Sequence, residues 1–206
     1  ELNRTEGKSG QNIRLTIETN LQKFALERLK GMSGSSVLME IDSGDILSLV
    51  STPSYNPNNF VLGISQSDWN ALLNDERKPL LNKATSGAYP PGSTFKMVVA
   101  AAALELGLIG LNDKIFCAGF YELGSRKFHC WLKGGHGKLN LQEGIQKSCD
   151  VYFYELARKV GVKRIGDMAR RLGLGQAYNL PLTGLSKGFV PTKRWKKEKF
   201  GTSWLV

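Results

Sequence analysis

Ser93 and Lys96 are the two side chains whose types and spacing best suit covalent chemistry. They belong to the segment Ser93-Thr94-Phe95-Lys96, which follows Pro90-Pro91-Gly92 and precedes the apolar run from Met97 to Leu106. If this run is a helix, its first turn places both side chains on one face, so a neutral lysine amine could take the serine proton. The free N–H groups of a helix start also favour developing negative charge. The pattern predicts an acylating serine, although Ser-x-x-Lys also arises by chance and Ser93 could be only a helix cap.

A second polar motif, Ser148-Cys149-Asp150, lies further along the chain, within the stretch 141–160 that is predicted to be helical. It has the Ser-x-Asn/Asp form that penicillin-recognising serine acyltransferases place beside Ser-x-x-Lys. The alternative is that Ser148 and Asp150 are polar residues on a solvated helix face. Two motifs in this order favour the catalytic interpretation.

Longer segments resemble the class B penicillin-binding proteins. The segment Gly87 to Lys96 is similar to their active-site block, and residues 37–51 and 53–58 resemble the hairpin and loop that open their transpeptidase domain. Further matches point to the elongation-type penicillin-binding protein 2 group, and they lie at 72–75, 79–84, 135–137 and 191–195. The resemblance therefore covers nearly the whole chain.

The resemblance implies an α+β fold of the penicillin-binding protein and serine β-lactamase-like transpeptidase type, an antiparallel sheet with packed helices. Residues 1–206 are expected to be part of one such domain, incomplete at the C-terminus, with a sheet-starting region 12–51, a helical active-site region 67–173 and a basic stretch 187–206. With 41% hydrophobic residues, the chain has enough apolar material for a core.

Hydrophobic periodicity and turn residues predict the individual elements. The expected strands are 12–17, 36–42 and 46–51, the last two around the turn Asp42 to Asp45. The expected helices are 18–30, 67–74, 93–107, 140–160 and 163–173, with a loop at 53–59 and a Gly-rich excursion at 113–138. The aromatic residues Trp131 and Tyr152 to Tyr154 are expected to pack in the core.

The resemblance also implies an activity, that of a D,D-transpeptidase that cross-links peptidoglycan from D-alanyl-D-alanine stem peptides. Ser93 would be acylated with loss of D-alanine, and Lys96 would be its base. Ser148 would relay a proton to or from the amine, and Asp150 would hold the polar network around Lys96 and Ser148. β-Lactam antibiotics mimic the donor peptide and leave a stable acyl-enzyme.

A third family element, a Lys-Thr/Ser-Gly triplet on the strand that lines the substrate groove, is expected after the second motif. No such triplet occurs between Asp150 and Val206, so the chain by itself is expected to be catalytically incomplete and slow to acylate. Lys8-Ser9-Gly10 matches the letters but precedes Ser93 in a polar turn, and it is not assigned to this role.

Three cysteines and a histidine form a separate set of possible ligands. Cys117, Cys130, His136 and Cys149 follow the spacing Cys-x12-Cys-x5-His-x12-Cys. Spacing alone does not separate a tetrahedral zinc site from ordinary thiols, and His129 could replace His136. A single disulfide would leave one cysteine unpaired, whereas one metal ion would use all three.

The resemblance favours the metal, because some penicillin-binding protein 2 enzymes carry zinc near the active site with a ligand inside the second motif. Cys149 occupies that position, and His136 lies in the Gly135-His136-Gly137 segment. Four protein ligands would make such a zinc structural. It would tie the loop 116–131 to the segment that bears Ser148 and Asp150.

Partners and location follow from charge and from the resemblance. The net charge of +10 could favour anionic surfaces, but the basic run Lys193 to Lys199 is interpreted as a solvated face, and no nucleic-acid partner is expected. The resemblance implies a periplasmic catalytic domain at the inner membrane, held by an anchor outside this chain, with a glycosyltransferase and elongation-complex proteins as partners. No signal peptide or starting Met precedes Glu1, which is therefore expected to lie downstream of any anchor.

Two other functions share the same first motif. One is a serine β-lactamase or D,D-carboxypeptidase, and the other is a non-catalytic β-lactam sensor or zinc-stabilised binding module. The Gly-rich excursion and the segment Pro53 to Asn59 favour the transpeptidase. The lifetime of the acyl-enzyme separates the alternatives, because a β-lactamase releases its acyl group quickly.

Overall fold

The computed structural model describes residue 7 and residues 9–201 of the chain. Its contacts divide into two units, the first formed by residues up to Gly87 with Leu182–Gly184, and the second by Ala88–Pro181 and the residues from Leu185 onward. Lys8 of the Lys8-Ser9-Gly10 segment and residues 202–206 of the basic stretch lie outside the described residues. Among the described residues, no helix is both long and apolar enough to cross a bilayer.

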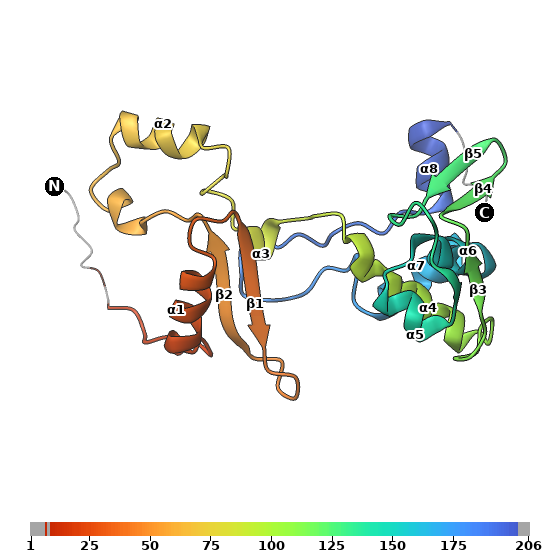
Figure 1. Ribbon diagram of the computed structural model, residues 1–206. Coiled ribbons are helices and arrows are strands. Elements are labelled where there is room, and N and C mark those ends of the chain that lie inside the picture. Colours follow the sequence, from red (N-terminus) through yellow and green to blue (C-terminus); the bar gives the residue numbers. More distant parts are fainter. Residues whose placement is uncertain (1–6, 8, 202–206) are drawn as a thin grey trace. The chain divides into compact units, whose positions relative to one another are not determined.

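The first unit is built on the hairpin of β1 (Gly34–Met39) and β2 (Ile46–Thr52), which pair antiparallel (Figure 1). The register runs from Gly34 opposite Thr52 to Leu38 opposite Ser48, with an irregularity between Leu38 and Met39. The predicted strands 36–42 and 46–51 are thus confirmed with shifted ends. The other elements of this unit are η1 (Pro57–Phe60), which overlaps the predicted loop 53–59, α2 (Gln66–Asn74) and α3 (Lys83–Ser86).

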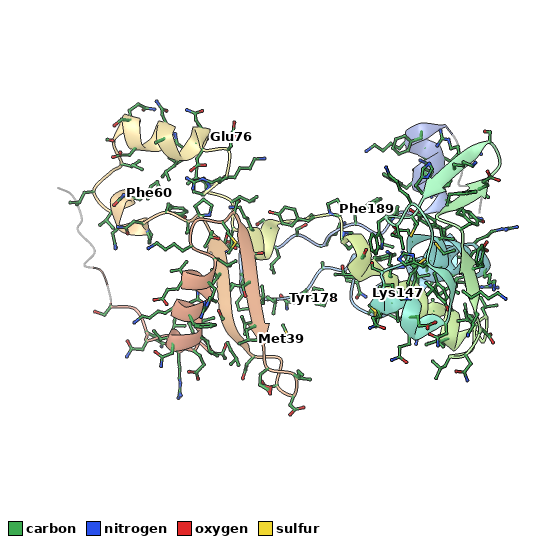
Figure 2. All side chains as sticks on the ribbon, in the orientation of Figure 1. Met39, Phe60, Glu76, Lys147, Tyr178 and Phe189 are labelled. Carbon is green, nitrogen blue, oxygen red and sulfur yellow. The ribbon has the colours of Figure 1, made fainter. Side chains whose placement is uncertain are left out.

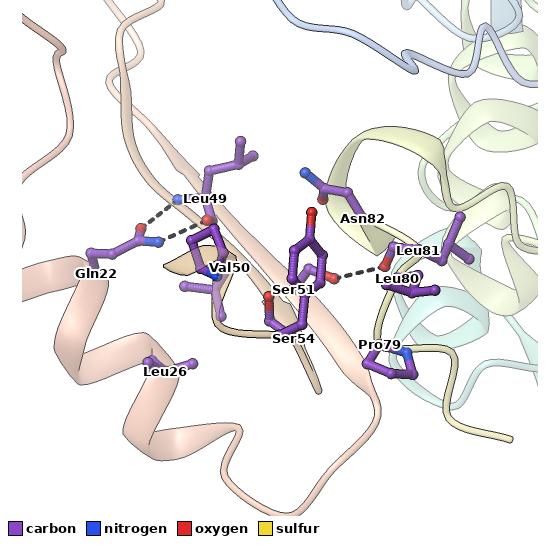
Figure 3. A pocket seen from close by; sticks show the side chains of 12 residues that line it. Gln22, Leu26, Leu49, Val50, Ser51, Ser54, Pro79, Leu80, Leu81 and Asn82 are labelled. Carbon is purple, nitrogen blue, oxygen red and sulfur yellow. Dashed lines mark hydrogen bonds between the residues drawn. The ribbon is translucent and has the colours of Figure 1, made fainter. Parts of the chain in front are cut away.

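Helix α1 (Thr19–Arg28) packs against β2, and its Gln22 side chain hydrogen-bonds the strand. Its amide donates to the Leu49 carbonyl at 2.8 Å and accepts from the Leu49 N–H at 2.8 Å, so it pairs with the strand as another strand would (Figure 3). A cavity of about 400 Å³ opens beside this contact, lined by Gln22, Leu26, Leu49, Tyr55 and Leu81 among others. None of the predicted site residues lines it.

The predicted strand 12–17 is wrong. Residues 9–18 have no regular secondary structure, and Ile13 and Leu15 are exposed. Among the described residues, the hydrogen bonds of this segment lie at its end, where the Thr16 hydroxyl donates to the Ile46 carbonyl at 2.7 Å and the Glu18 N–H to the Leu47 carbonyl at 2.8 Å. Alternating hydrophobicity alone does not make a strand, because a strand needs a partner for its backbone groups.

The second unit has a helical core. Helices α4 (Lys96–Glu105), α6 (Asp150–Val160) and α7 (Val162–Arg171) pack against one another. Three buried alanines of α4, at 100, 102 and 103, permit close approach, and Leu156, Met168 and Ala169 complete the contact. Helix α4 follows the 3-10 turn η2 (Gly92–Phe95), and α5 (Leu141–Gln146) precedes α6. The basic helix α8 (Lys193–Phe200) contains no buried residue.

The Gly-rich excursion between α4 and α5 forms two small antiparallel pairs rather than a loop. Strands β3 (Ile115–Cys117) and β6 (Gly137–Leu139) pair so that Cys117 lies opposite Gly137. Strands β4 (Phe120–Leu123) and β5 (Arg126–His129) form a hairpin between them. This topology brings the beginning and the end of the excursion together.

Two predictions about the second unit are wrong in detail. The stretch 140–160 is not one helix, because it breaks between Gln146 and Asp150. Trp131 and Tyr154 are not buried core residues, since they are 62% and 36% exposed, whereas Tyr152 and Phe153 are buried as expected. Both differences concern the segments that build the site.

Candidate active site and metal centre

Ser93 lies in a 3-10 turn immediately before α4, as the sequence predicts, although the turn is 3-10 and not α. Gly92 opens the turn with φ +56°, a left-handed conformation that favours glycine. Ser93 is exposed, and the described residues include no hydrogen-bond partner for its hydroxyl. The hydroxyl is therefore free to meet a ligand.

Lys96 binds the second motif. Its Nζ donates to the Ser148 carbonyl at 2.8 Å, to Ser148 Oγ at 3.0 Å and to Asp150 Oδ1 at 2.7 Å. An ammonium group has three N–H donors, so these contacts account for all of them. Within the described part of the chain, no hydrogen bond joins Lys96 to Ser93. The structure thus brings together Lys96, Ser148 and Asp150, and leaves Ser93 beside them in sequence without a direct bond.

The second motif lies in the break between α5 and α6 and not on a helix face. Ser148 has φ +47°, an unusual conformation for a residue with a side chain. Its N–H donates to Ile145 O at 2.9 Å, and the N–H of Cys149 donates to Gly144 O at 3.0 Å. The Ser148 carbonyl points to Lys96 instead of into the helix, and Cys149 Sγ accepts from the Tyr152 N–H as the cap of α6. Strain of this kind clusters at functional sites.

Asp150 links the motif to the excursion. Its Oδ1 binds Lys96, and its Oδ2 accepts from the backbone N–H of Trp131 at 3.0 Å. The Lys96 and Asp150 side chains are 15% and 25% exposed, so their ion pair is screened less than a surface pair. The carboxylate is therefore held from two sides.

The ligand atoms of Cys117, Cys130, His136 and Cys149 all lie within 4.8 Å of one another. Cys130 Sγ is 4.0 Å from Cys149 Sγ and 3.5 Å from His136 Nδ1, and Cys117 Sγ is 3.7 Å from the same Nδ1. A tetrahedral zinc with bonds of about 2.3 Å to sulfur and about 2.0 Å to nitrogen separates its ligands by roughly 3.5–3.8 Å. A disulfide would need about 2.05 Å. The donor set therefore fits a metal ion and leaves all three cysteines as free thiols.

His136 and not His129 completes the cluster. His129 ends β5 and is exposed, whereas His136 directs Nδ1 at the thiols, and its Nε2 is buried without a partner in the described residues. The backbone turns at Gly135, which has φ +76° and lies close to Cys117. Only glycine fits there, because a Cβ would lie 2.3 Å from the Cys117 carbonyl oxygen. The backbone of the excursion is packed around the ligands.

The thiols differ in acidity. Burial raises the pKa of Cys130, but the N–H groups of Leu132, Val151 and Asp150 outweigh it, so that the pKa is lowered. Burial, with help from the neighbouring Cys117 and Cys130, raises the pKa of Cys149 to about 12. Without a metal the cluster therefore favours the thiolate of Cys130 and disfavours that of Cys149. A divalent cation would supply the positive charge that three thiolates require.

Two residues that contribute to this site, Trp131 and Lys147, carry no motif that assigns them to it. Trp131 donates its indole N–H to the Lys147 carbonyl at 3.0 Å, and its ring contacts His136 edge-on at a centroid distance of 5.2 Å. The position of Trp131 directly after Cys130 is the only sequence signal that could have indicated its role.

The chain is similar in sequence to known proteins. The penicillin binding protein transpeptidase domain family matches residues 34–206. The peptidoglycan D,D-transpeptidase MrdA of Escherichia coli K12 is 39% identical over 206 residues, which are 99% of this chain and 32% of that protein. The chain thus spans about a third of the length of this curated relative.

Solved structures show the same fold. Penicillin-binding protein 2 of Pseudomonas aeruginosa, solved in complex with WCK 5153, superposes with a TM-score of 0.86 at 38% identity, over 92% of this chain and 44% of that one. Penicillin-binding protein 2 of Helicobacter pylori, solved in a complex with MreC, gives a TM-score of 0.86 at 37% identity, over 91% of this chain and 36% of that one. The predicted α+β fold, with antiparallel strands and packed helices, is confirmed.

Proposed function

Because the chain belongs to the penicillin binding protein transpeptidase domain family, we propose that it is the acylating part of a peptidoglycan D,D-transpeptidase. The observation that carries this proposal is the set of three hydrogen bonds from Lys96 to Ser148 and Asp150, three positions after an exposed Ser93. Two motifs that are distant in sequence meet there in one polar network. The substrate is the D-alanyl-D-alanine end of a stem peptide, and β-lactam antibiotics occupy the same place.

In the proposed mechanism, Ser93 Oγ attacks the carbonyl carbon of the D-Ala–D-Ala bond. Its proton passes to the amine of Lys96, which acts in its neutral form, the C–N bond breaks, and D-alanine leaves with this proton on its nitrogen. An amine of a second stem peptide then attacks the ester, loses a proton and restores the Ser93 hydroxyl. Ser148 Oγ, at 3.0 Å from Lys96 Nζ, is placed to relay these protons.

Asp150 has an electrostatic role in this mechanism. Its carboxylate fixes Lys96 Nζ at 2.7 Å and compensates the ammonium charge whenever Lys96 holds the proton. A fixed partner needs no reorganisation during the reaction, which is the main advantage of a preorganised site. We assign Asp150 to holding the network and not to attack or proton transfer.

We infer that the cysteine and histidine cluster holds a zinc ion with a structural role. Cys117, Cys130, His136 and Cys149 would be its four ligands, which leaves no position for a reacting water. The ion would fix the excursion against the break that carries Ser148. A Cys149→Ser protein that retains stoichiometric zinc and the full melting temperature would contradict this inference, and Ser125→Ala, on the exposed β4–β5 turn, is the matched control.

The proposed surroundings follow from the relatives. The Helicobacter pylori protein was solved with MreC, so we propose an MreC-like elongation partner, together with a glycosyltransferase, for the protein that contains this chain. We place its catalytic part in the periplasm, at an inner membrane that an anchor outside this chain would reach. Copurification of MreC with the tagged native protein tests the first of these proposals.

The function itself is tested by intact mass after incubation with benzylpenicillin. The longest native polypeptide that contains this chain is expected to gain one adduct, absent in Ser93→Ala and present in Ser125→Ala. An adduct that persists in Ser93→Ala would exclude Ser93 as the nucleophile. An adduct lost within minutes would instead favour a β-lactamase, and a stable adduct without peptide cross-linking would favour a sensor.

The same mass measurement on the 206-residue chain alone tests the expectation that this chain is acylated slowly. The strand that carries the Lys-Thr/Ser-Gly triplet would supply one N–H of the oxyanion hole, and removal of such a donor costs about 3 kcal/mol of transition-state stabilisation, or roughly 100-fold in rate. We therefore expect adduct formation on the chain alone to be at least that much slower than on the longer protein. Equal rates would contradict this expectation.

A further inference from the structure

The Trp131 side chain is largely exposed, yet both its backbone N–H and its indole N–H are hydrogen-bonded. The residue is 62% exposed, so burial of its ring contributes little to its placement. Its backbone N–H donates to Asp150 Oδ2 and its indole N–H to the Lys147 carbonyl, each at 3.0 Å. An exposed tryptophan that is fixed by two directional bonds serves something other than the core.

The two bonds reach both sides of the strained residue of the second motif. Lys147, labelled in Figure 2, lies directly before Ser148, and Asp150 lies two positions after it. Ser148 itself has φ +47°, which residues with side chains avoid unless their surroundings impose it. Trp131 thus bridges the segment in which both the carbonyl and the hydroxyl of Ser148 face Lys96.

The same residue belongs to the ligand cluster on its other side. It follows Cys130 directly, and its ring lies edge-on to the His136 imidazole at a centroid distance of 5.2 Å. Movement of the cysteine and histidine cluster would therefore move the backbone N–H that holds Asp150. Trp131 contacts His136 through its ring and Asp150 through its backbone, so it joins the two groups directly.

We propose that Trp131 is a positioning residue that fixes the Ser148 to Asp150 segment in the conformation that Lys96 binds, and so couples the ligand cluster to acylation. The predicted effect of Trp131 on the acylation rate rests on the proposed function, whereas its predicted effect on the conformation of the Ser148 to Asp150 segment does not. Trp131 acts through the backbone at Lys147 and through the Asp150 carboxylate, and takes no part in bond making. The alternative role is direct contact of the ring with a ligand, which would change the dissociation constant of the non-covalent complex.

The test uses Trp131→Phe, which keeps the backbone N–H and an aromatic ring at the position that faces His136 but removes the indole donor. Trp195→Phe is the matched control, because Trp195 lies in α8 and its indole N–H has no hydrogen-bond partner in the described residues. Both variants are made in the longest native polypeptide that contains this chain. Zinc content and melting temperature are measured first, and are expected to match the wild type because the ring is retained.

Two readouts follow. Hydrogen exchange at the Ser148 and Cys149 amides, which donate to Ile145 and Gly144, is expected to rise roughly 5-fold in Trp131→Phe, the value for loss of one neutral hydrogen bond of about 1 kcal/mol. The first-order rate constant for acylation by benzylpenicillin is expected to fall by a similar factor. The dissociation constant of the preceding non-covalent complex is expected to stay within about 2-fold.

Unchanged exchange at Ser148 and Cys149 in Trp131→Phe would overturn the proposal, whatever the kinetics show. An effect confined to the dissociation constant would also overturn it, because it would make the ring a ligand contact. If the wild type is not acylated, the proposed function fails, and the exchange measurement still decides the role of Trp131. Should Trp131→Phe fold poorly, Trp131→Tyr, which also lacks the indole donor, gives the same readouts.

Discussion

Gly135→Ala is the substitution for which the structure predicts the clearest loss. Gly135 has φ +76°, and a Cβ built there would lie 2.3 Å from Cys117 O, 2.6 Å from Gly119 N and 2.7 Å from Ala118 C. All three atoms belong to the backbone, so no side-chain rotation can relieve the contact. Because van der Waals contacts between heavy atoms lie near 3.5 Å, the backbone at Gly135 and the segment 117–119 must separate by about 1 Å.

Two costs combine in this variant. An L-residue in the left-handed region costs about 1–2 kcal/mol, and forced separation of packed groups costs about 1–3 kcal/mol. Their sum, about 3 kcal/mol, is a large part of the roughly 5–15 kcal/mol that holds a typical domain together. The movement also displaces Cys117 from His136 and Cys130, and ligand positions tolerate changes of only about 0.2 Å.

The assay is urea unfolding with zinc analysis of the same samples. At roughly 2 kcal/mol per molar urea, the midpoint of Gly135→Ala is expected to fall by about 1.5 M, with at least roughly tenfold weaker zinc binding. Gly134→Ala is the control, because a Cβ added at Gly134 would meet no atom within 4 Å and its φ is not positive. The stability of this control is expected to stay within about 0.5 kcal/mol of the wild type.

The reasoning would be refuted by a Gly135→Ala protein whose midpoint and zinc content equal those of Gly134→Ala. Such a result would mean that the backbone at Gly135 can move away from the segment 117–119 without a loss of stability. It would also mean that the close packing of Gly135 against Cys117 does not hold the ligand cluster. Loss of zinc without loss of stability would refute only the proposed structural role of the ion.

Two further predictions concern the same segments. Since burial raises the pKa of Cys149 to about 12, that thiol is protonated at neutral pH without metal, and zinc must displace the proton. The affinity of the protein for zinc is therefore expected to strengthen as pH rises from about 6 to about 8. Titration calorimetry in two buffers should show proton release on zinc binding, and its absence would contradict a thiolate ligand. Ser148→Gly is expected to be more stable than Ser148→Ala by about 1 kcal/mol, because glycine accepts φ +47° whereas alanine retains the strain. Unfolding midpoints decide this, and equal values would show that the backbone relaxes in both variants.

Local pattern is sufficient for much of the fold. It predicts the helix at 18–30, the hairpin strands around Asp42 to Asp45 and the helix at 163–173, and the structure shifts their ends by only a few residues. Their signals are short-range, since periodicity, turn glycines and caps lie within the element itself. The strand predicted at 12–17 fails because strand formation depends on a distant partner, which no local pattern contains.

The break at Ser148 shows what local pattern cannot supply. Residues 140–160 have the pattern of one helix, yet Lys96, more than forty positions earlier, takes the Ser148 carbonyl and hydroxyl, and Cys149 caps a new helix. These contacts outweigh helix propensity, which amounts to less than about 1 kcal/mol per residue. The choice between one helix and two is therefore tertiary.

The chemical groups of the site can all be identified from the chain's own letters: a serine and a lysine at the start of a helix, a second Ser-x-Asp motif, and three cysteines with a histidine. Folding settles which of these meet, that His136 and not His129 faces the thiols, and that Trp131 connects the two groups. The physical reason is the separation along the sequence of the residues that interact. Residue types and helix starts are set by neighbours along the chain, whereas ligand distances of 3.5–4.0 Å and a shared carboxylate arise only when segments far apart in sequence pack together.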